Sequence, residues 1–204
     1  MRPDDHAEWA VERDDMLRVL RRHGIRDERV LAAMRTVPRH RFIPPGHLDP
    51  AASGDFPRPI GFGQTISQPY IVAHMTERLD VRPGMRVLEV GTGCGYQAAV
   101  LAALGATVYS VERIAALSTL ARSALDDCGF GQVRLRLGDG YEGWPEEAPF
   151  DRILAACAPP VIPAALCGQL LCGGRMILPV GVDPQRLAIV VKEPAGLRIA
   201  DDLW

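Results

Sequence analysis

The sequence predicts an α/β fold with a mostly parallel sheet, helices on both faces, an antiparallel edge and an N-terminal helical extension. From residue 71 onward, short apolar runs alternate with amphipathic segments, as in parallel strands joined by helices. A glycine-rich turn, GTGCG at 91–95, joins one apolar run to the next helix. The last apolar runs are joined too tightly for a crossover helix, which predicts antiparallel pairing at one edge.

Composition narrows the class of protein. The chain has 204 residues, 48% of them hydrophobic and 24% charged, which is ordinary for one soluble globular domain. The 23 Lys and Arg nearly balance the 25 Asp and Glu. Because this balance gives neither a nucleic-acid footprint nor a polybasic membrane anchor, we expect neither partner. The charged N-terminus lacks the apolar centre of a signal peptide, so we expect a cytoplasmic protein. We also expect the protein to be a monomer.

Cysteine usage argues against a metal site. The five cysteines form an odd number, and no pair has CxxC spacing. We therefore expect neither bound metal nor a disulfide framework. Most of the cysteines lie among apolar residues or glycines, which favours small buried side chains.

The chain divides near residue 60. Residues 1–60 are expected to form the helical extension and a loop, and residues 61–204 the core, within one structural domain. Helical spacing of apolar residues predicts a helix over 4–23, with Gly24 suited to a left-handed cap. Asp27 opens a second helix, and the segment from 38 to 59 is expected to be a loop with short turns.

The core is expected to contain the following elements in order. Helices are expected at 71–79, from the glycine turn to 105, at 113–130 and at 163–171. Strands are expected at 87–90, 107–112, 133–139, 150–157, 173–181, 186–193 and 197–204, the last two as a hairpin.

The glycine turn has the spacing GxGxG. In the dinucleotide fingerprint GxGxxG the third glycine comes one residue later, where this chain has Tyr96. An acid before GxGxG instead suits S-adenosylmethionine, because its methionine end carries an ammonium and a carboxylate. Glu89 and the turn N–H groups would complement these charges, which gives an expected set of Glu89, Gly91, Thr92, Gly93, Cys94 and Gly95. Glu89 could alternatively cap the following helix.

Acids also end the next two strands. Glu112 is placed to accept hydrogen bonds from both ribose hydroxyls of the cofactor. Asp139 is placed to meet the adenine edge, although it could also be a turn former before Gly140. Arg113 and Gly140 complete the expected cofactor site. These positions lie at the carboxyl ends of strands, where ligands bind in such sheets.

The strip IGFGQTISQPY, at 60–70, fits no turn, strand or helix rule, but it carries a resemblance. This strip, followed in order by LEVGTGCGYQAAVLA, VYSVERI and GGRMILPVG, resembles the protein-L-isoaspartate O-methyltransferase family from about Gly24 to Lys192. The GQTISQP segment is specific to that family, whereas the glycines and acids occur in methyltransferases at large. The resemblance implies a Rossmann-like, S-adenosylmethionine-dependent methyltransferase fold.

The resemblance also implies a function. Such enzymes methylate the free carboxylate of L-isoaspartyl residues in damaged proteins and peptides, releasing S-adenosylhomocysteine, and the ester then collapses to a succinimide. By resemblance, Thr65 and Ser67 are the catalytic residues at the carboxylate site. Gln64 and Ile66 join them in the substrate strip, which would pack over the cofactor. Turn chemistry beside Pro69 is the alternative explanation for the two hydroxyls.

This chemistry needs few catalytic groups. A carboxylate is already ionised and nucleophilic at pH 7, so the protein must position it and remove its water. His74 is therefore interpreted as a helix side chain. Cys94 stands where the family commonly has Ser; its thiol is a weaker donor and would be oxidation-sensitive if accessible. Two rival hypotheses are a methyltransferase for a dedicated peptide precursor and a non-catalytic adenosylmethionine-binding protein.

Overall fold

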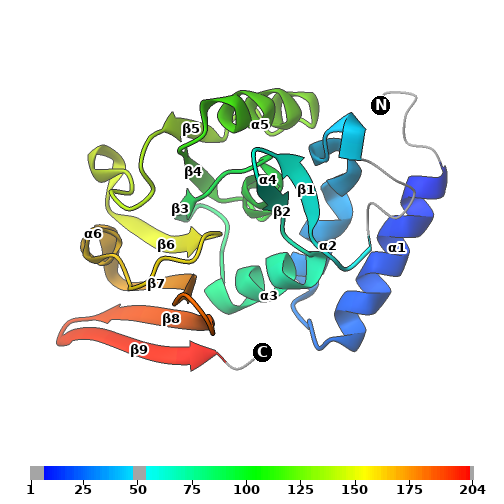
Figure 1. Cartoon of the computed structure of the whole chain (residues 1–204). Coiled ribbons are helices and arrows are strands. Elements are labelled where there is room, and N and C mark those ends of the chain that lie inside the picture. The colour runs from blue at the N-terminus through cyan, green and yellow to red at the C-terminus, as the bar shows by residue number, and fades with distance from the viewer. Residues whose placement is uncertain (1–6, 48–53, 203–204) are drawn as a thin grey trace.

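The computed structural model describes residues 7–47 and 54–202, and it confirms the α/β fold (Figure 1). A seven-stranded sheet has the order β5-β4-β3-β6-β7-β8-β9. Pairing is parallel from β5 to β7, whereas β8 runs antiparallel to both β7 and β9. The strands are β3 (Arg86–Val90), β4 (Thr107–Glu112), β5 (Arg134–Leu137), β6 (Phe150–Ala155), β7 (Leu170–Val180), β8 (Arg186–Glu193) and β9 (Gly196–Asp202).

The sheet is covered on both faces, but unequally. Its larger core lies under the helices α3 (Pro69–Leu79), α4 (Tyr96–Ala103) and α5 (Ala115–Asp127). Val87 and Val108 point into this side because side chains alternate along a strand. Leu88 and Tyr109 point to the opposite face, which is covered by the short helix α6 (Ala164–Gln169) and the 3-10 turn η3 (Pro145–Glu147).

The N-terminal extension packs onto the larger core. Helix α1 (Ala7–Arg22) is followed by Gly24 at φ +97°, and helix α2 (Glu28–Thr36) starts after Asp27, whose carboxylate accepts from the Arg29 N–H at 2.9 Å. Both predictions of helix ends are thus confirmed. One buried cluster runs without interruption from the extension into the sheet.

The segment from 38 to 59 contains short turns, as expected, but it ends in a strand that was not predicted. Two 3-10 turns, η1 (Arg39–Phe42) and η2 (Pro45–His47), follow α2. The strip at 60–70, which fits no turn, strand or helix rule, takes part in a β-hairpin. In this hairpin β1 (Arg58–Gly61) pairs antiparallel with β2 (Gln64–Ile66). The hairpin leads directly into α3, so it brings the substrate strip close to the sheet.

The strand order places a ligand site at one edge of the sheet. In chain order the core strands run outward from β3 through β4 to β5, and then from β6 to β7 on the other side. The order therefore reverses between β3 and β6, and such a switch point leaves a crevice at the carboxyl ends of the strands. No helix within the described residues is long and apolar enough to cross a membrane.

Candidate active site

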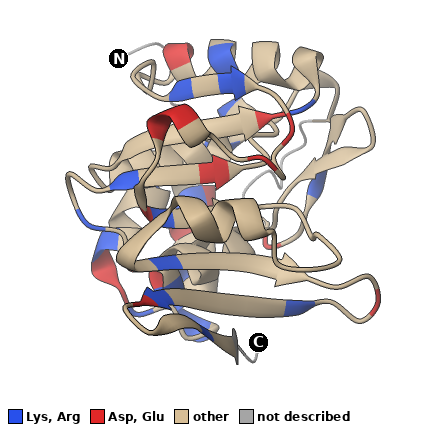
Figure 2. Cartoon of the chain, turned by 90° about the vertical axis from the view of Figure 1, so that its left-hand side faces the viewer, with Lys and Arg blue, Asp and Glu red and all other residues tan. Residues whose placement is uncertain are grey.

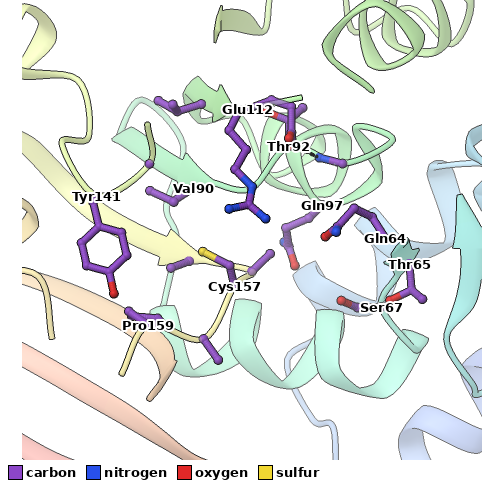
Figure 3. A pocket seen from close by; sticks show the side chains of 18 of the residues that line it. Gln64, Thr65, Ser67, Val90, Thr92, Gln97, Glu112, Tyr141, Cys157 and Pro159 are labelled. Carbon is purple, nitrogen blue, oxygen red and sulfur yellow. Dashed lines mark hydrogen bonds between the residues drawn. The ribbon is translucent and has the colours of Figure 1, made fainter. Parts of the chain in front are cut away.

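A cavity of about 360 Å³ opens at this switch point (Figure 3), which is within the usual size of a small-molecule site. It lies between the hairpin strip and the loops that follow β3, β4, β5 and β6. All the expected site residues except Glu89 and Gly95 line it, namely Gln64, Thr65, Ile66, Ser67, Gly91, Thr92, Gly93, Cys94, Glu112, Arg113, Asp139 and Gly140. The structure thus brings together segments that are far apart in sequence.

The glycine turn depends on left-handed backbone. Gly91 and Gly93 have φ of +93° and +55°, a region that L-residues rarely adopt. A Cβ on Gly93 would also lie 3.3 Å from Cδ1 of Ile60 in the hairpin. Gly95 is the N-cap of α4 and packs against Leu125, behind the cavity wall. It shapes the turn without lining the cavity.

Glu112 ties the glycine turn to the end of β4. Its side chain is only 6% exposed, and its two oxygens accept backbone N–H groups from Gly93 at 2.8 Å and Ile114 at 2.9 Å. Each carboxylate oxygen has a second lone pair available, so the group can still accept hydroxyl hydrogen bonds from the cavity. Glu112 therefore both shapes the turn and presents acceptors to a ligand.

The loop after β5 forms the next part of the wall. Asp139 is exposed, and its Oδ1 accepts the Tyr141 N–H at 2.9 Å, so it forms the turn that the sequence left open as an alternative. It lines the cavity as well. Gly140 lies so close to β3 that an added Cβ would come within 2.3 Å of Cγ1 of Val90. A glycine at this position lets the loop approach the strand end.

Glu89 lies behind the wall. Its side chain is fully buried, and the Ser110 hydroxyl donates to Oε2. The Oγ atoms of Ser110 and Thr92 are 2.5 Å apart, so a chain of hydrogen bonds connects Glu89 to the glycine turn. Burial raises the pKa of Glu89 from 4.5 to about 8. At pH 7 this raised pKa favours the neutral acid.

Some of the cysteines are buried and others are exposed, whereas the sequence favoured burial for most of them. Cys94 lines the cavity but is 6% exposed, and burial raises the pKa of its thiol to about 11. It is therefore neither accessible nor ionised, so the condition for oxidation sensitivity is not met. Cys157 and Cys172 are exposed, and Cys157 lines the cavity. Cys157 follows β6 and Cys172 lies near the start of β7, and an apolar sequence does not guarantee burial at either position.

The substrate strip forms the wall opposite Tyr141 and Pro159. Figure 3 shows the side chains of Gln64, Thr65 and Ser67 gathered at one end of the cavity. Thr65 is exposed and Ser67 is half-buried, so both hydroxyls lie near the entrance. Strand pairing with β1 holds Gln64, Thr65 and Ile66 in place.

A buried arginine, which the sequence did not single out, supports the strip. Arg39 in η1 is fully buried, and its Nη2 donates to the carbonyl oxygens of Ser67 at 2.9 Å and Phe56 at 3.4 Å. Its guanidinium also lies 5.8 Å from the ring centroid of Tyr96. The extension thereby fixes the backbone beside the predicted catalytic hydroxyl. The apolar residues around PRHRF were the only sequence signal for this burial.

Several other lining residues were also not predicted from the sequence. Gln97, in the first turn of α4, is 9% exposed and donates to Oγ1 of Thr76 at 3.0 Å. The segment after β6 contributes the remaining wall, including Cys157 and Pro159. Its position at the carboxyl end of a strand was the available signal.

Comparison with known proteins agrees with this geometry. Residues 11–203 match the model of the family described as protein-L-isoaspartate(D-aspartate) O-methyltransferase. A protein-L-isoaspartate O-methyltransferase of Gloeobacter violaceus is 51% identical over 180 residues, covering 87% of each chain.

Solved structures agree as well. One protein-L-isoaspartate O-methyltransferase superposes with a TM-score of 0.84 at 28% identity, and the match covers 94% of this chain and 63% of that chain. A Plasmodium falciparum structure assigned to the same enzymes, in complex with S-adenosyl-L-homocysteine, has a TM-score of 0.81 at 25% identity and covers 93% of this chain and 94% of that one. The chain belongs to the protein-L-isoaspartate O-methyltransferase family.

Proposed function

We propose that the protein transfers a methyl group from S-adenosylmethionine to the free carboxylate of L-isoaspartyl residues in damaged proteins and peptides. The observation that carries this proposal is the shared cavity, where the strip Gln64–Ser67 faces the glycine turn. The family's name supplies the reaction, and the cavity supplies a place for both reactants. The resulting ester leaves the enzyme and closes to a succinimide, which begins the repair.

The residues that line the cavity suit the chemical groups of the cofactor. Glu112 presents acceptors suited to the two ribose hydroxyls, and Asp139 stands where the adenine edge would lie. Gly140 and Val90 both line this part of the cavity. Residues 91–94 of the glycine turn and Arg113 line the part of the cavity where the methionine end would lie. When bound, S-adenosylmethionine supplies an electrophilic methyl group on a sulfonium.

The protein's part in the reaction is to bind and orient the isoaspartyl carboxylate. The hydroxyls of Thr65 and Ser67 donate hydrogen bonds that fix one oxygen without neutralising it as an arginine would. No general base is needed because the carboxylate is ionised at neutral pH. Enclosure between the hairpin and the glycine turn removes water from this oxygen, and alignment supplies much of the rate enhancement.

The decisive assay compares matched peptides. Incubation with labelled S-adenosylmethionine is expected to give base-labile label on a peptide containing isoaspartate and none on the same peptide containing aspartate. The reason is geometric, since the extra methylene in the backbone moves the carboxylate. Label on neither peptide, despite measured cofactor binding, would identify a non-catalytic binding protein. A label restricted to one dedicated sequence would instead favour a precursor-specific enzyme.

The substrate strip provides a second arm of this assay. Ser67→Ala is expected to lower kcat/KM for the isoaspartyl peptide by roughly tenfold, through loss of one hydrogen bond to a charged group. The Kd for S-adenosylhomocysteine should stay the same because the change lies on the peptide side. Ser118→Ala, on the outer helix α5, is a matched control.

Thiol labelling tests where the cofactor lies. Cys157 lines the cavity and Cys172 lies outside it, and both are exposed. S-adenosylhomocysteine is expected to protect Cys157 from iodoacetamide and to leave Cys172 reactive, as read by peptide mass spectrometry. Cys94 should remain unlabelled at pH 8 with or without ligand, because burial raises its pKa to about 11. Equal labelling of Cys157 in both conditions would place the cofactor elsewhere.

The chain is proposed to act as a monomeric cytoplasmic protein without nucleic-acid or membrane partners. Acidic and basic side chains are interspersed over the strands and helices in Figure 2, which fits the near-neutral net charge. The five unpaired cysteines suit a reducing compartment. Residues 1–60 and 61–204 are proposed to work as one unit, because Arg39 supports the strip at Ser67.

A further inference from the structure

The tip of the hairpin carries a residue that turn chemistry does not favour. Phe62 and Gly63 form the two-residue connection between β1 and β2, with φ of +55° and +70°. Positive φ at both residues is the signature of a type I′ turn, which prefers Asn, Asp or Gly at its first position. A phenylalanine there costs backbone free energy, because a bulky side chain is strained in the left-handed region.

Packing of the Phe62 side chain does not offset this cost. Its side chain is 59% exposed, and it lies outside both buried clusters. Ile60 and Ile66 anchor the hairpin instead, since both are buried in the larger core. An aromatic side chain that is neither favoured by its turn nor used in the core is therefore available for binding.

Its position suits a peptide substrate. Gln64 lies two residues after Phe62 and pairs with Gly61. The Nε2 atom of Gln64 lies 3.5 Å from the carbonyl oxygen of Phe62. Gln64 starts the strip that lines the cavity. Because strand residues rise about 3.3 Å each, Phe62 lies within the reach of a few residues of extended peptide from Thr65 and Ser67. We expect a peptide with its carboxylate at the strip to pass this ring.

We propose that Phe62 determines specificity by contacting an aliphatic or aromatic side chain that flanks the isoaspartyl residue. This inference rests on the proposed function of the cavity. Such a contact would bury apolar surface on both partners and needs no sequence-specific hydrogen bond. It would favour damaged segments whose apolar residues have become exposed by local unfolding over damage in charged surface loops.

The test uses Phe62→Asn, which places a preferred residue in the turn. Its Tm is expected to equal or exceed that of the unmodified protein, because asparagine relieves the strain at positive φ. Initial rates would be measured on isoaspartyl peptides that carry either leucine or serine at the flanking positions. The unmodified protein should show kcat/KM about three- to tenfold higher for the leucine peptides, and Phe62→Asn should abolish this preference through KM.

Two further variants separate a specific contact from a general effect. Phe62→Tyr keeps the ring and should keep the preference. Leu197→Thr removes a similarly exposed apolar side chain, 45% exposed, from the edge strand β9 and should also leave it intact. Equal kcat/KM for all peptides, or a preference that survives Phe62→Asn, would overturn this inference and leave the methyltransferase assignment standing. Failure of the unmodified protein to methylate any isoaspartyl peptide would overturn both.

Discussion

Replacing Glu112 by alanine is expected to weaken binding of S-adenosylmethionine by roughly ten- to a hundredfold, which corresponds to about 1.5–3 kcal/mol for loss of charge-assisted hydrogen bonds. The carboxylate lines the cavity and also accepts the N–H groups of Gly93 and Ile114. The substitution therefore removes the proposed acceptors for the ribose and releases the backbone of the glycine turn. Isothermal titration calorimetry with the cofactor and with S-adenosylhomocysteine measures the loss.

A matched control separates this effect from a general loss of negative charge. Glu146 is an exposed acid outside the cavity, paired with Arg136 at 2.6 Å, so Glu146→Ala should leave the Kd unchanged. A thermal melt should show that Glu112→Ala remains folded at the titration temperature. If the folded variant binds the cofactor with unaltered affinity, Glu112 has no part in the site.

The wall of the cavity formed by the glycine turn and Glu112 could be predicted from sequence because local rules determine it. Glycine is required where φ is positive, and an acid at the end of a parallel strand must lie at the ligand edge of the sheet. Gly91, Gly93 and Glu112 follow these rules, and the structure places them in one wall. The antiparallel edge could be predicted as well, because the connections between the last strands are too short for a crossover helix.

The wall formed by the hairpin could not be predicted from local rules. Strands β1 and β2 span only four and three residues, and their turn lacks the usual Asn-Gly or Asp-Gly signal. The hairpin is stabilised by tertiary contacts, including Arg39 beneath Ser67 and Ile60 against Gly93. Only the family resemblance pointed to the function of this strip. The sequence also did not show to which face of the sheet the Glu89 side chain points, because the alternation of side chains along β3 depends on the register of the strand.

Glu89 leads to the second large effect, a pH-dependent stability. Its pKa is 4.5 in an ordinary environment and about 8 in the folded protein, where burial opposes ionisation. The folded state therefore binds this proton more tightly than the unfolded state does. The resulting stabilisation is fully present below pH 4.5 and is lost as the pH rises through 8. The penalty above that pH is on the order of a few kcal/mol.

The isosteric variant Glu89→Gln carries no ionisable group at this position. Denaturant unfolding at a series of pH values gives the free energy of unfolding of both proteins, and other titrating groups cancel in their difference. The variant is expected to gain stability relative to the unmodified protein between pH 5 and pH 8.5. Parallel stability curves across this range would show that Glu89 is not protonated in the folded state.

The same variant decides between two roles for Glu89 in cofactor binding. If Glu89 is the ionised partner of the cofactor's ammonium, Glu89→Gln must weaken binding at pH 7. If Glu89 is instead a neutral acid that positions Thr92 through Ser110, the side-chain oxygen of the introduced glutamine can accept the same hydrogen bond from the Ser110 hydroxyl. The Kd for the cofactor should then change little. We expect the second result, because the side chain is fully buried behind the cavity wall and Oε1 has no hydrogen-bond partner among the described residues. An ionised carboxylate in that position would be strongly disfavoured.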